Sequence, residues 1–320
     1  MNESGDSRDG RAMGYFALLI LVNLMWAFQY TGARIATQKL GPITVAFLPM
    51  VMSTVLLSLL LLLERRRESR KAPVERGSFG RTLLNFVVLA VVGSFVAQLG
   101  LTSGVKHSLA SNASVITLTI PVLTALLATV LVGEKMSRLL WVSFALAIIG
   151  VLLVSDVDWR TVHIFRGKYL FGNALILAGC FGSAFYNAYS KRLLRIFTPL
   201  EVLVYSLSIG DVALCMAMLA RERVSWQYWA SLGFAVWLSL GIIAVFSLTI
   251  AMTLFFWVIK RIDLTQAALS IYLLPVFGVL ISTVTLKEKV RWQLLAGGIM
   301  VFVGTFLATR YGQRKGARQA

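Results

Sequence analysis

Three polar or aromatic residues, Asn23, Trp26 and Tyr30, stand at helical spacing inside an apolar stretch near the start of the chain. Separations of three and seven residues place all three on one face of a helix. Amide and hydroxyl groups can hydrogen-bond a small molecule, and an indole ring can stack on an apolar group or a cation. We therefore expect this face to bind a ligand, with simple packing as the alternative for Trp26.

A second polar face occurs in a later apolar stretch, at Ser183, Tyr186 and Asn187. Polar side chains in apolar helices tend to face a bundle interior or a water-filled cavity. The remaining candidates inside apolar stretches are Gln98, Asn112, Ser114, Ser247, Gln266 and Ser270. We predict that these residues and the two faces line one substrate-binding cavity. The alternative is that they only form hydrogen bonds between helices.

Asp211 is the one carboxylate that we expect near the middle of an apolar stretch, YSLSIGDVALCMAML. Ionisable residues in such places are costly and often functional. The chemistry that Asp211 offers is proton coupling or pairing with an amine substrate. The alternative is a neutral Asp211 that bonds to a hydroxyl group at the periphery of the bundle.

The elements that hold these residues must be membrane-spanning helices. Of the 320 residues, 58% are hydrophobic and 14% are charged, and the mean hydropathy is +0.79. Apolar stretches of about 20 residues, enough to cross a bilayer, recur along the chain. Their predicted limits are residues 14–36, 43–63, 83–104, 110–132, 138–155, 169–190, 199–220, 235–258, 264–286 and 291–309. Because lipid leaves open strands without backbone partners, we predict an all-α polytopic membrane protein with ten transmembrane helices.

One stretch of the sequence is repeated. PVLTALLATVLVGEK, from Pro121 to Lys135, returns 154 positions later as PVFGVLISTVTLKEK, from Pro275 to Lys289. Residues 117–155 align with 271–309 without a gap and share 10 of 39 positions. Each half then holds five spans, so the second half must insert with the opposite orientation. Two inverted repeats of this kind are typical of transporters that bind their substrate at the repeat interface.

The repeated motif contains two kinds of structural residue. Pro121 and Pro275 cannot donate to the carbonyl four residues earlier, so we expect each span to be kinked, either statically or as a hinge. Glu134 and Glu288 stand close to the start of the next helix. We expect both carboxylates to stabilise the start of that helix, where the helix dipole favours negative charge.

The repeat and the charges divide the chain into five parts. These are a cytoplasmic N-terminal tail (1–13), a first five-helix repeat (14–155), a connecting loop (156–168), a second five-helix repeat (169–309) and a basic cytoplasmic tail (310–320). With the N-terminus inside, 20 Lys and Arg residues face the cytoplasm and 11 face the exterior. This positive-inside pattern predicts a multi-pass protein of the bacterial inner membrane with both termini in the cytoplasm.

Residues typical of enzymes and metal sites are scarce. The only histidines are His107 and His163, and Cys180 and Cys215 show no metal-site or redox spacing. No GxxxxGK[ST] nucleotide-binding loop occurs. We expect no catalytic residue, no metal and no cofactor. The net charge of +17 lies in the connections, which argues for a membrane surface and against nucleic acid.

With these features in place, the chain resembles the EamA family of the drug/metabolite transporter (DMT) superfamily. The resemblance is carried by ASNASVITLTIPVLTALLATVLVGEK and TQAALSIYLLPVFGVLISTVTLKEK, with Trp26 and a Gly-Pro pair before the second span. It covers about residues 14–309 and implies a central cavity lined by the helices that carry the polar faces. One departure is Leu48, close to the proline of the second span, where the family often has Arg.

The sequence and the resemblance together predict a secondary transporter, more specifically an exporter, of small metabolites or drugs. It is expected to work by alternating access without ATP. The expected partners are a small-molecule substrate, the lipid bilayer and protons as the coupling ion. Two alternatives stay open: a membrane-embedded enzyme or flippase acting on lipid-linked substrates, and a nucleotide-sugar carrier of the same fold.

Overall fold

The computed structural model of the protein describes residues 3–68, 78–108, 110–154, 160–165, 167–222, 225–286 and 292–316. Within these ranges the chain is helical and contains no strand. Six helices are long and apolar enough to cross a membrane: Pro42–Arg67, Phe79–Leu101, Val115–Val132, Gly167–Leu193, Pro199–Arg221 and Phe234–Ile259. Four shorter apolar helices are Met13–Gln29, Arg138–Leu153, Leu264–Gly278 and Leu295–Ala308. The predicted all-helical class is confirmed.

The described part of the first half contributes eight helical elements. They are α1 (Glu3–Thr37), α2 (Pro42–Glu68), α3 (Phe79–Val88), the π-helical η1 (Leu89–Phe95), α4 (Val96–Lys106), α5 (Ala110–Thr117), α6 (Thr119–Val132) and α7 (Arg138–Val154). The elements α3, η1 and α4 follow one another without a gap. Such π-helical turns often occur at functional sites.

The second half contributes nine elements among the described residues. They are α8 (Gly167–Leu193), α9 (Pro199–Arg221), α10 (Trp226–Ala230), α11 (Phe234–Ile242), the π-helical η2 (Ile243–Ala251), α12 (Met252–Ile259), α13 (Leu264–Ser270), α14 (Leu273–Leu286) and α15 (Trp292–Gly316). A π-helical segment therefore lies within one long helix of each half.

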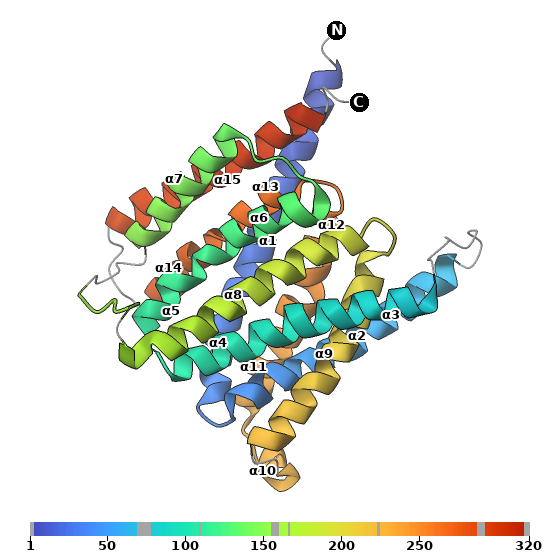
Figure 1. Ribbon diagram of the computed structural model, residues 1–320, viewed down its shortest axis with the longest axis vertical. Coiled ribbons are helices and arrows are strands. Elements are labelled where there is room, and N and C mark those ends of the chain that lie inside the picture. The colour runs from blue at the N-terminus through green and yellow to red at the C-terminus, as the bar shows by residue number, and fades with distance from the viewer. Residues whose placement is uncertain are drawn as a thin grey trace.

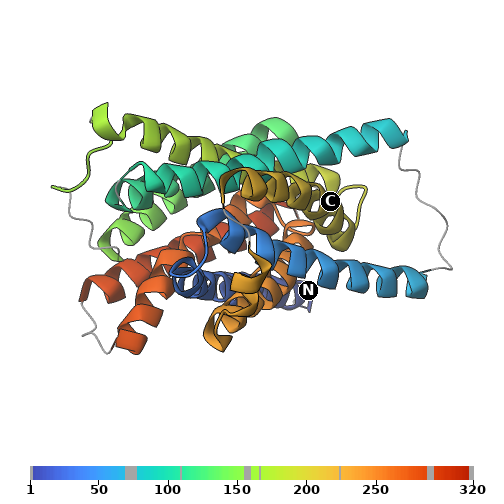
Figure 2. The ribbon, with the colours of Figure 1, turned by 90° about the horizontal axis from the view of Figure 1, so that it is seen from below.

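Helices from the two halves pack against one another throughout the bundle. The most extensive contacts are α7 with α15, α4 with α8, α6 with α8, and α2 with α9, while α1 contacts η2, α11 and α14. Figure 2 shows α4 and α8 on one side of the bundle and α1 and α2 on the other. The start of α1 and the end of α15 lie at the same end of the molecule (Figure 1).

The largest buried apolar cluster lies among α2, α8, α9 and α12. It includes Leu57, Leu203, Phe255 and Phe256, all fully buried. Glycines allow the closest helix approach, between α4 and α8. A Cβ atom on Gly100 would lie 2.6 Å from the backbone nitrogen of Gly179. Small residues at such crossings let membrane helices pack backbone to backbone.

Two helices are interrupted shortly before the prolines of the repeated motif. The first interruption is Leu118, which separates α5 from α6 and lies three residues before Pro121. The second is Ile271–Tyr272, which separates α13 from α14 and ends three residues before Pro275. A proline removes one backbone donor and crowds the preceding turn, which accounts for breaks at these places.

Candidate functional site

A buried polar contact joins α1 to α13. The side-chain nitrogen Nδ2 of Asn23 donates to the carbonyl of Leu19 at 2.7 Å and to Oγ of Ser270 at 3.0 Å. Ser270 in turn donates to the carbonyl of Ala267 at 2.7 Å. Asn23 and Ser270 are both fully buried. The contact brings together side chains that are 247 residues apart in the sequence.

Two carbonyl oxygens beside this contact have no hydrogen-bond partner among the described residues. They are Oδ1 of Asn23 and Oε1 of Gln266. Gln266 lies one turn before Ser270 on α13, and its Nε2 donates to Oδ2 of Asp263 at 3.1 Å. An unpaired buried acceptor costs about 1–3 kcal/mol and calls for an explanation. Each oxygen is therefore a candidate acceptor for a hydrogen-bond donor on a ligand.

Trp26 lies one turn after Asn23 on α1 and connects this helix to η2. Its indole Nε1 donates to the carbonyl of Ser247 at 3.2 Å, and Oγ of Ser247 donates to the carbonyl of Met25 at 3.4 Å. The indole ring lies 5.1 Å from the ring of Phe255. We call the set Asn23, Trp26, Ser247, Gln266 and Ser270 the central polar group. Hydrogen bonds join Asn23 to Ser270 and Trp26 to Ser247, and Gln266 lies one turn before Ser270 on α13.

The polar face of α8 makes its hydrogen bond away from the central polar group. The Tyr186 hydroxyl shares a hydrogen bond of 2.9 Å with Ser206 of α9, and its ring lies 6.0 Å from Phe256. Ser183 and Asn187 are half-buried on the same helix. Tyr186 is therefore engaged with α9 and α12 and not with the central polar group.

Asn112 hydrogen-bonds to the segment that precedes α8 and to α8 itself. Its Oδ1 accepts from the backbone N–H of His163 at 2.7 Å, and its Nδ2 donates to the His163 carbonyl at 3.2 Å and to Asn173 at 3.3 Å. These bonds hold the segment before α8 against α5. Gln98 is half-buried on α4. The side chains of Tyr30 and Ser114, and the whole of Glu288, lie outside the described residues.

Asp211 lies in the pair formed by α9 and α2. It interacts with Thr54 of α2, and its Oδ1 has no hydrogen-bond partner in the described part of the chain. Asp211 is half-buried. Because α9 packs mainly along α2 and η1, this carboxylate is set apart from the central polar group on α1 and α13.

Glu134 stabilises a different helix from the one that we predicted. Its two carboxylate oxygens accept the backbone N–H groups of Leu264 at 2.6 Å and Thr265 at 2.8 Å, in the first turn of α13. The next helix along the chain, α7, is served by Ser137, whose Oγ accepts from the N–H of Leu140 at 3.2 Å. A carboxylate at a helix start was expected, but the assignment to the adjacent helix was wrong because the fold brings α13 closer.

The environment of Glu134 is partly apolar and mixed in charge. Burial raises the pKa of the Glu134 carboxyl above its ordinary value, and the N–H groups of Thr265 and Leu264 offset part of that rise. Asp263 repels the carboxylate and Lys191 attracts it. The sequence did not connect Lys191 or Asp263 with Glu134, because nothing local links these residues.

Glu222 makes the corresponding contact on α2. Its carboxylate accepts from the N–H groups of Ile43 at 2.7 Å and Thr44 at 2.9 Å, and from the Thr44 hydroxyl at 2.6 Å. A Cβ atom on Gly41 would lie 2.2 Å from the Glu222 carboxyl carbon, so only glycine leaves room for it. Because 178 or more residues separate the partners, no local sequence pattern indicates this contact.

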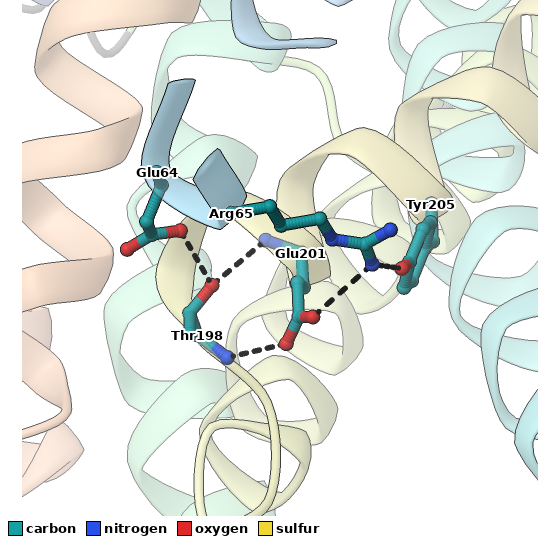
Figure 3. Close-up of polar contacts among 5 residues, drawn as sticks. All are labelled: Glu64, Arg65, Thr198, Glu201 and Tyr205. Atoms are coloured by element: carbon teal, nitrogen blue, oxygen red, sulfur yellow. Dashed lines mark hydrogen bonds and ion pairs between the residues drawn. The ribbon is translucent and has the colours of Figure 1, made fainter. Parts of the chain in front are cut away.

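A third polar cluster fastens the end of α2 to the start of α9 (Figure 3). Arg65 donates to Glu201 at 3.3 Å and to the Tyr205 hydroxyl. Thr198 and Glu201 form a capping box, in which each side chain accepts the other residue's backbone N–H. Glu64 accepts from the Thr198 hydroxyl at 3.3 Å. The local sequence Thr-Pro-Leu-Glu is a capping-box signature, so this part could have been found from the sequence.

Comparison with known proteins decides the family. The profile of the EamA-like transporter family matches the chain twice, at residues 13–156 and 170–310. This chain belongs to the EamA-like transporter family. The resemblance found in the sequence is thus confirmed, and the chain is a membrane transporter with several membrane-spanning helices, not a member of an enzyme family.

Relatives of this EamA-like transporter are named as transporters. The "Uncharacterized transporter YoaV" of Bacillus subtilis is 20% identical over 93% of this chain and 97% of its own length. The "Uncharacterized inner membrane transporter YedA" of Escherichia coli is 26% identical over 90% of this chain and 88% of its own. The "Probable terminal-alkyne amino-acid exporter" of Streptantibioticus cattleyicolor is 24% identical over 93% of this chain and 95% of its own.

A solved structure shares the fold of this EamA-like transporter. The crystal structure of another protein superposes with a TM-score of 0.75 at 18% identity. The match covers 95% of this chain and 98% of the other. At this identity the likeness speaks for the fold alone.

Proposed function

We propose that this EamA-like transporter is a secondary carrier that exports small metabolites or drugs by alternating access, and that it binds them at the central polar group. The observation that carries the proposal is the pair of unpaired, buried carbonyl oxygens on Asn23 and Gln266, which face no partner among the described residues. They stand on helices of the two halves, α1 and α13, where a carrier of this kind binds its substrate. The name of the Streptantibioticus relative supports export as the direction.

The chemistry of the group favours a substrate that donates hydrogen bonds. Carbonyl oxygens accept from ammonium, amide or hydroxyl groups and cannot pair with a carboxylate or phosphate. Trp26 and Phe255 add an aromatic surface that suits an apolar side chain or a cation. None of the five side chains in the central polar group is charged. A phosphate-bearing cargo such as a nucleotide sugar is therefore disfavoured.

We further propose that ten spans form two inverted five-helix repeats, residues 14–155 and 169–309. The two family matches, the six long and four shorter apolar helices, and the offset of 154 residues between the motif copies support this arrangement. The excess of Lys and Arg on one side supports an inner-membrane protein with both termini in the cytoplasm. In that orientation α6 ends, and α13 begins, at the cytoplasmic face.

The test is transport by purified protein in liposomes. Unlabelled amino acids, amines and neutral amides are loaded inside, the same compounds carrying a radiolabel are added outside, and counterflow is measured with and without an imposed proton gradient. We expect counterflow of at least one compound that carries a hydrogen-bond donor. The variant Asn23→Leu, which has a similar volume but no amide, should lower the initial rate about tenfold or more, as expected for the loss of a buried hydrogen-bond acceptor.

The matched control is Thr129→Val, which removes a hydroxyl that only bonds back to the carbonyl of Leu126 on its own helix. It should transport like the unchanged protein. Counterflow that is equal in Asn23→Leu and in Thr129→Val would remove the central polar group from the substrate path. The absence of counterflow for every compound would count against the carrier itself.

A further inference from the structure

The contact between Glu134 and α13 joins the two halves of the chain at one end of the bundle. Both oxygens of the carboxylate are used, at 2.6 Å and 2.8 Å, and the residues that donate, Leu264 and Thr265, are fully buried. Hydrogen bonds to an ionised acceptor are about twice as strong as neutral ones. The contact is therefore among the strongest single links between α6 and α13.

Two basic side chains close the same end through backbone carbonyls. Arg195 donates to the carbonyl of Val132, the last residue of α6, at 2.7 Å. Lys191 donates to the carbonyls of Ile259 and, at 2.8 Å, Ile262, just before α13. The end of α6, the end of α8 and the turn before α13 thus meet at one place. We call this contact the Glu134 closure, made by Glu134, Lys191, Arg195, Leu264 and Thr265.

The closure is connected to the central polar group through one short helix. Thr265 is followed directly by Gln266, and Ser270 ends α13. The interruption at Ile271–Tyr272 separates this piece of seven residues from α14. Beyond Ser270 the backbone bonds tighten to i→i−3, with the N–H groups of Ile271 and Tyr272 donating to the carbonyls of Ala268 and Leu269 at 3.1 Å and 3.2 Å. The α13 helix therefore joins α14 through a turn and not through continuous α-helix. The position of Glu134 consequently sets where Gln266 and Ser270 stand relative to Asn23.

We propose that Glu134 is a positioning residue for transport. While its carboxylate holds the first N–H groups of α13, this end of the bundle is closed and the central polar group is assembled. When the carboxylate releases the N–H groups of Leu264 and Thr265, α13 moves and this end of the bundle opens to the solvent at that face of the membrane. The inference rests on the alternating-access function proposed above, and it assigns the opening of one face to a single named contact.

The test is a labelling experiment that needs no substrate. A reporter cysteine replaces the fully buried Thr265 in a chain in which Cys180 and Cys215 are changed to alanine. The protein is placed in nanodiscs, where both faces meet the solvent, and is labelled with a water-soluble maleimide. The reference is the Thr265→Cys protein that keeps Glu134. Relative to it, Glu134→Gln should raise the labelling rate of Thr265→Cys about tenfold, because one of two strong acceptor oxygens is replaced by a donor.

The matched control is Glu222→Gln, the same change at a carboxylate that also holds two N–H groups but at the start of α2. It should leave the labelling of Thr265→Cys within about twofold of the starting rate. A second reporter, Leu40→Cys, stands near Glu222 and is buried. Its labelling should not rise in Glu134→Gln, because only the Glu134 closure is weakened.

Two results would overturn the inference. One is an unchanged rate at Thr265→Cys in Glu134→Gln. The other is an equal rise at Thr265→Cys and Leu40→Cys, which would show a general loosening of the fold. If Glu134→Gln is not monodisperse in gel filtration, Glu134→Asp takes its place. It keeps the charge but withdraws the oxygens by one methylene, so it too must raise the labelling of Thr265→Cys.

The inference and the proposed function can fail separately. Counterflow in liposomes with unchanged labelling in Glu134→Gln would leave the carrier intact and remove Glu134 as its closing contact. Raised labelling at Thr265→Cys alone, with no counterflow for any compound, would support the role of the Glu134 closure and contradict the proposed substrates.

Discussion

The Tyr272 hydroxyl donates to the carbonyl of Leu118 at 2.8 Å and so joins the two helix interruptions of the molecule to each other. Leu118 separates α5 from α6, and Tyr272 lies between α13 and α14. The two residues are 154 positions apart, the same offset as the two copies of the proline motif. A broken helix exposes backbone carbonyls that must be paired when they are buried. Here Tyr272, in one interruption, supplies the hydroxyl that donates to the Leu118 carbonyl in the other interruption.

Removing this hydroxyl should destabilise the protein. Tyr272 is 1% exposed, and Tyr272→Phe leaves the Leu118 carbonyl without its side-chain donor. We expect the free energy of unfolding to fall by about 1–3 kcal/mol, measured by reversible unfolding in mixed micelles. The control is Tyr228→Phe. Its hydroxyl also donates to a carbonyl, that of Lys39, but the side chain is 45% exposed and the change should stay within about 0.5 kcal/mol. Equal losses in the two variants would contradict the role given to Tyr272.

The crossing of α4 and α8 should not tolerate a methyl group. In Gly100→Ala the new Cβ would lie 2.6 Å from the backbone of Gly179, which has no flexible side chain to move away. We expect a loss of about 1–3 kcal/mol, as for other over-packed sites, or a lower yield of folded protein. Gly241→Ala in α11 meets nothing within 4 Å and should stabilise the helix by about 0.5–1 kcal/mol. Thermal unfolding in detergent gives both values, and similar shifts for the two variants would refute the close-packing argument.

The two partners of the ion pair between α2 and α9 should contribute unequally. Glu201 is 3% exposed, accepts from Arg65 and also completes the capping box with Thr198. Glu201→Ala should therefore cost about 1–3 kcal/mol, because a helix cap and a buried acceptor are both lost. The Arg65 side chain is 50% exposed, so Arg65→Met should cost less than about 1 kcal/mol. Unfolding of the two single variants in the same micelles makes the comparison, and a larger cost for Arg65→Met would reverse the assignment.

Asp211 is the predicted coupling carboxylate, and its position allows a clean test. It stands on α9 against α2, so it does not touch the five side chains of the central polar group. We expect Asp211→Asn to abolish the acceleration of transport by an imposed proton gradient and to leave counterflow without a gradient intact. Flux that still responds to the gradient in Asp211→Asn would end the coupling hypothesis. Counterflow in the same vesicles serves as the internal control for folding.

The outcome at individual residues shows how far local patterns reach. The apolar stretches correctly predicted a helical chain, because each helix satisfies its own backbone groups and needs no distant partner in lipid. The Thr-Pro-Leu-Glu sequence at Thr198 encodes its capping box within four residues. The prediction for Glu134 was right about the type of contact and wrong about the helix. Its chemistry is local, but its nearest helix start is supplied by a segment 130 residues away.

By itself the sequence determined that this is a helical membrane protein, written as two related segments with helix breaks close to two prolines. Composition, hydrophobic periodicity and the missing backbone donor of proline act over one or two helical turns. They can therefore be recognised in the sequence. Only the tertiary structure decided that Asn23 meets Ser270, that Tyr186 turns to Ser206, and that Glu134 holds α13. Each of these contacts pairs one polar group with another on a different helix. Many helices present such groups at the same spacing, so the choice of partner is made by packing geometry.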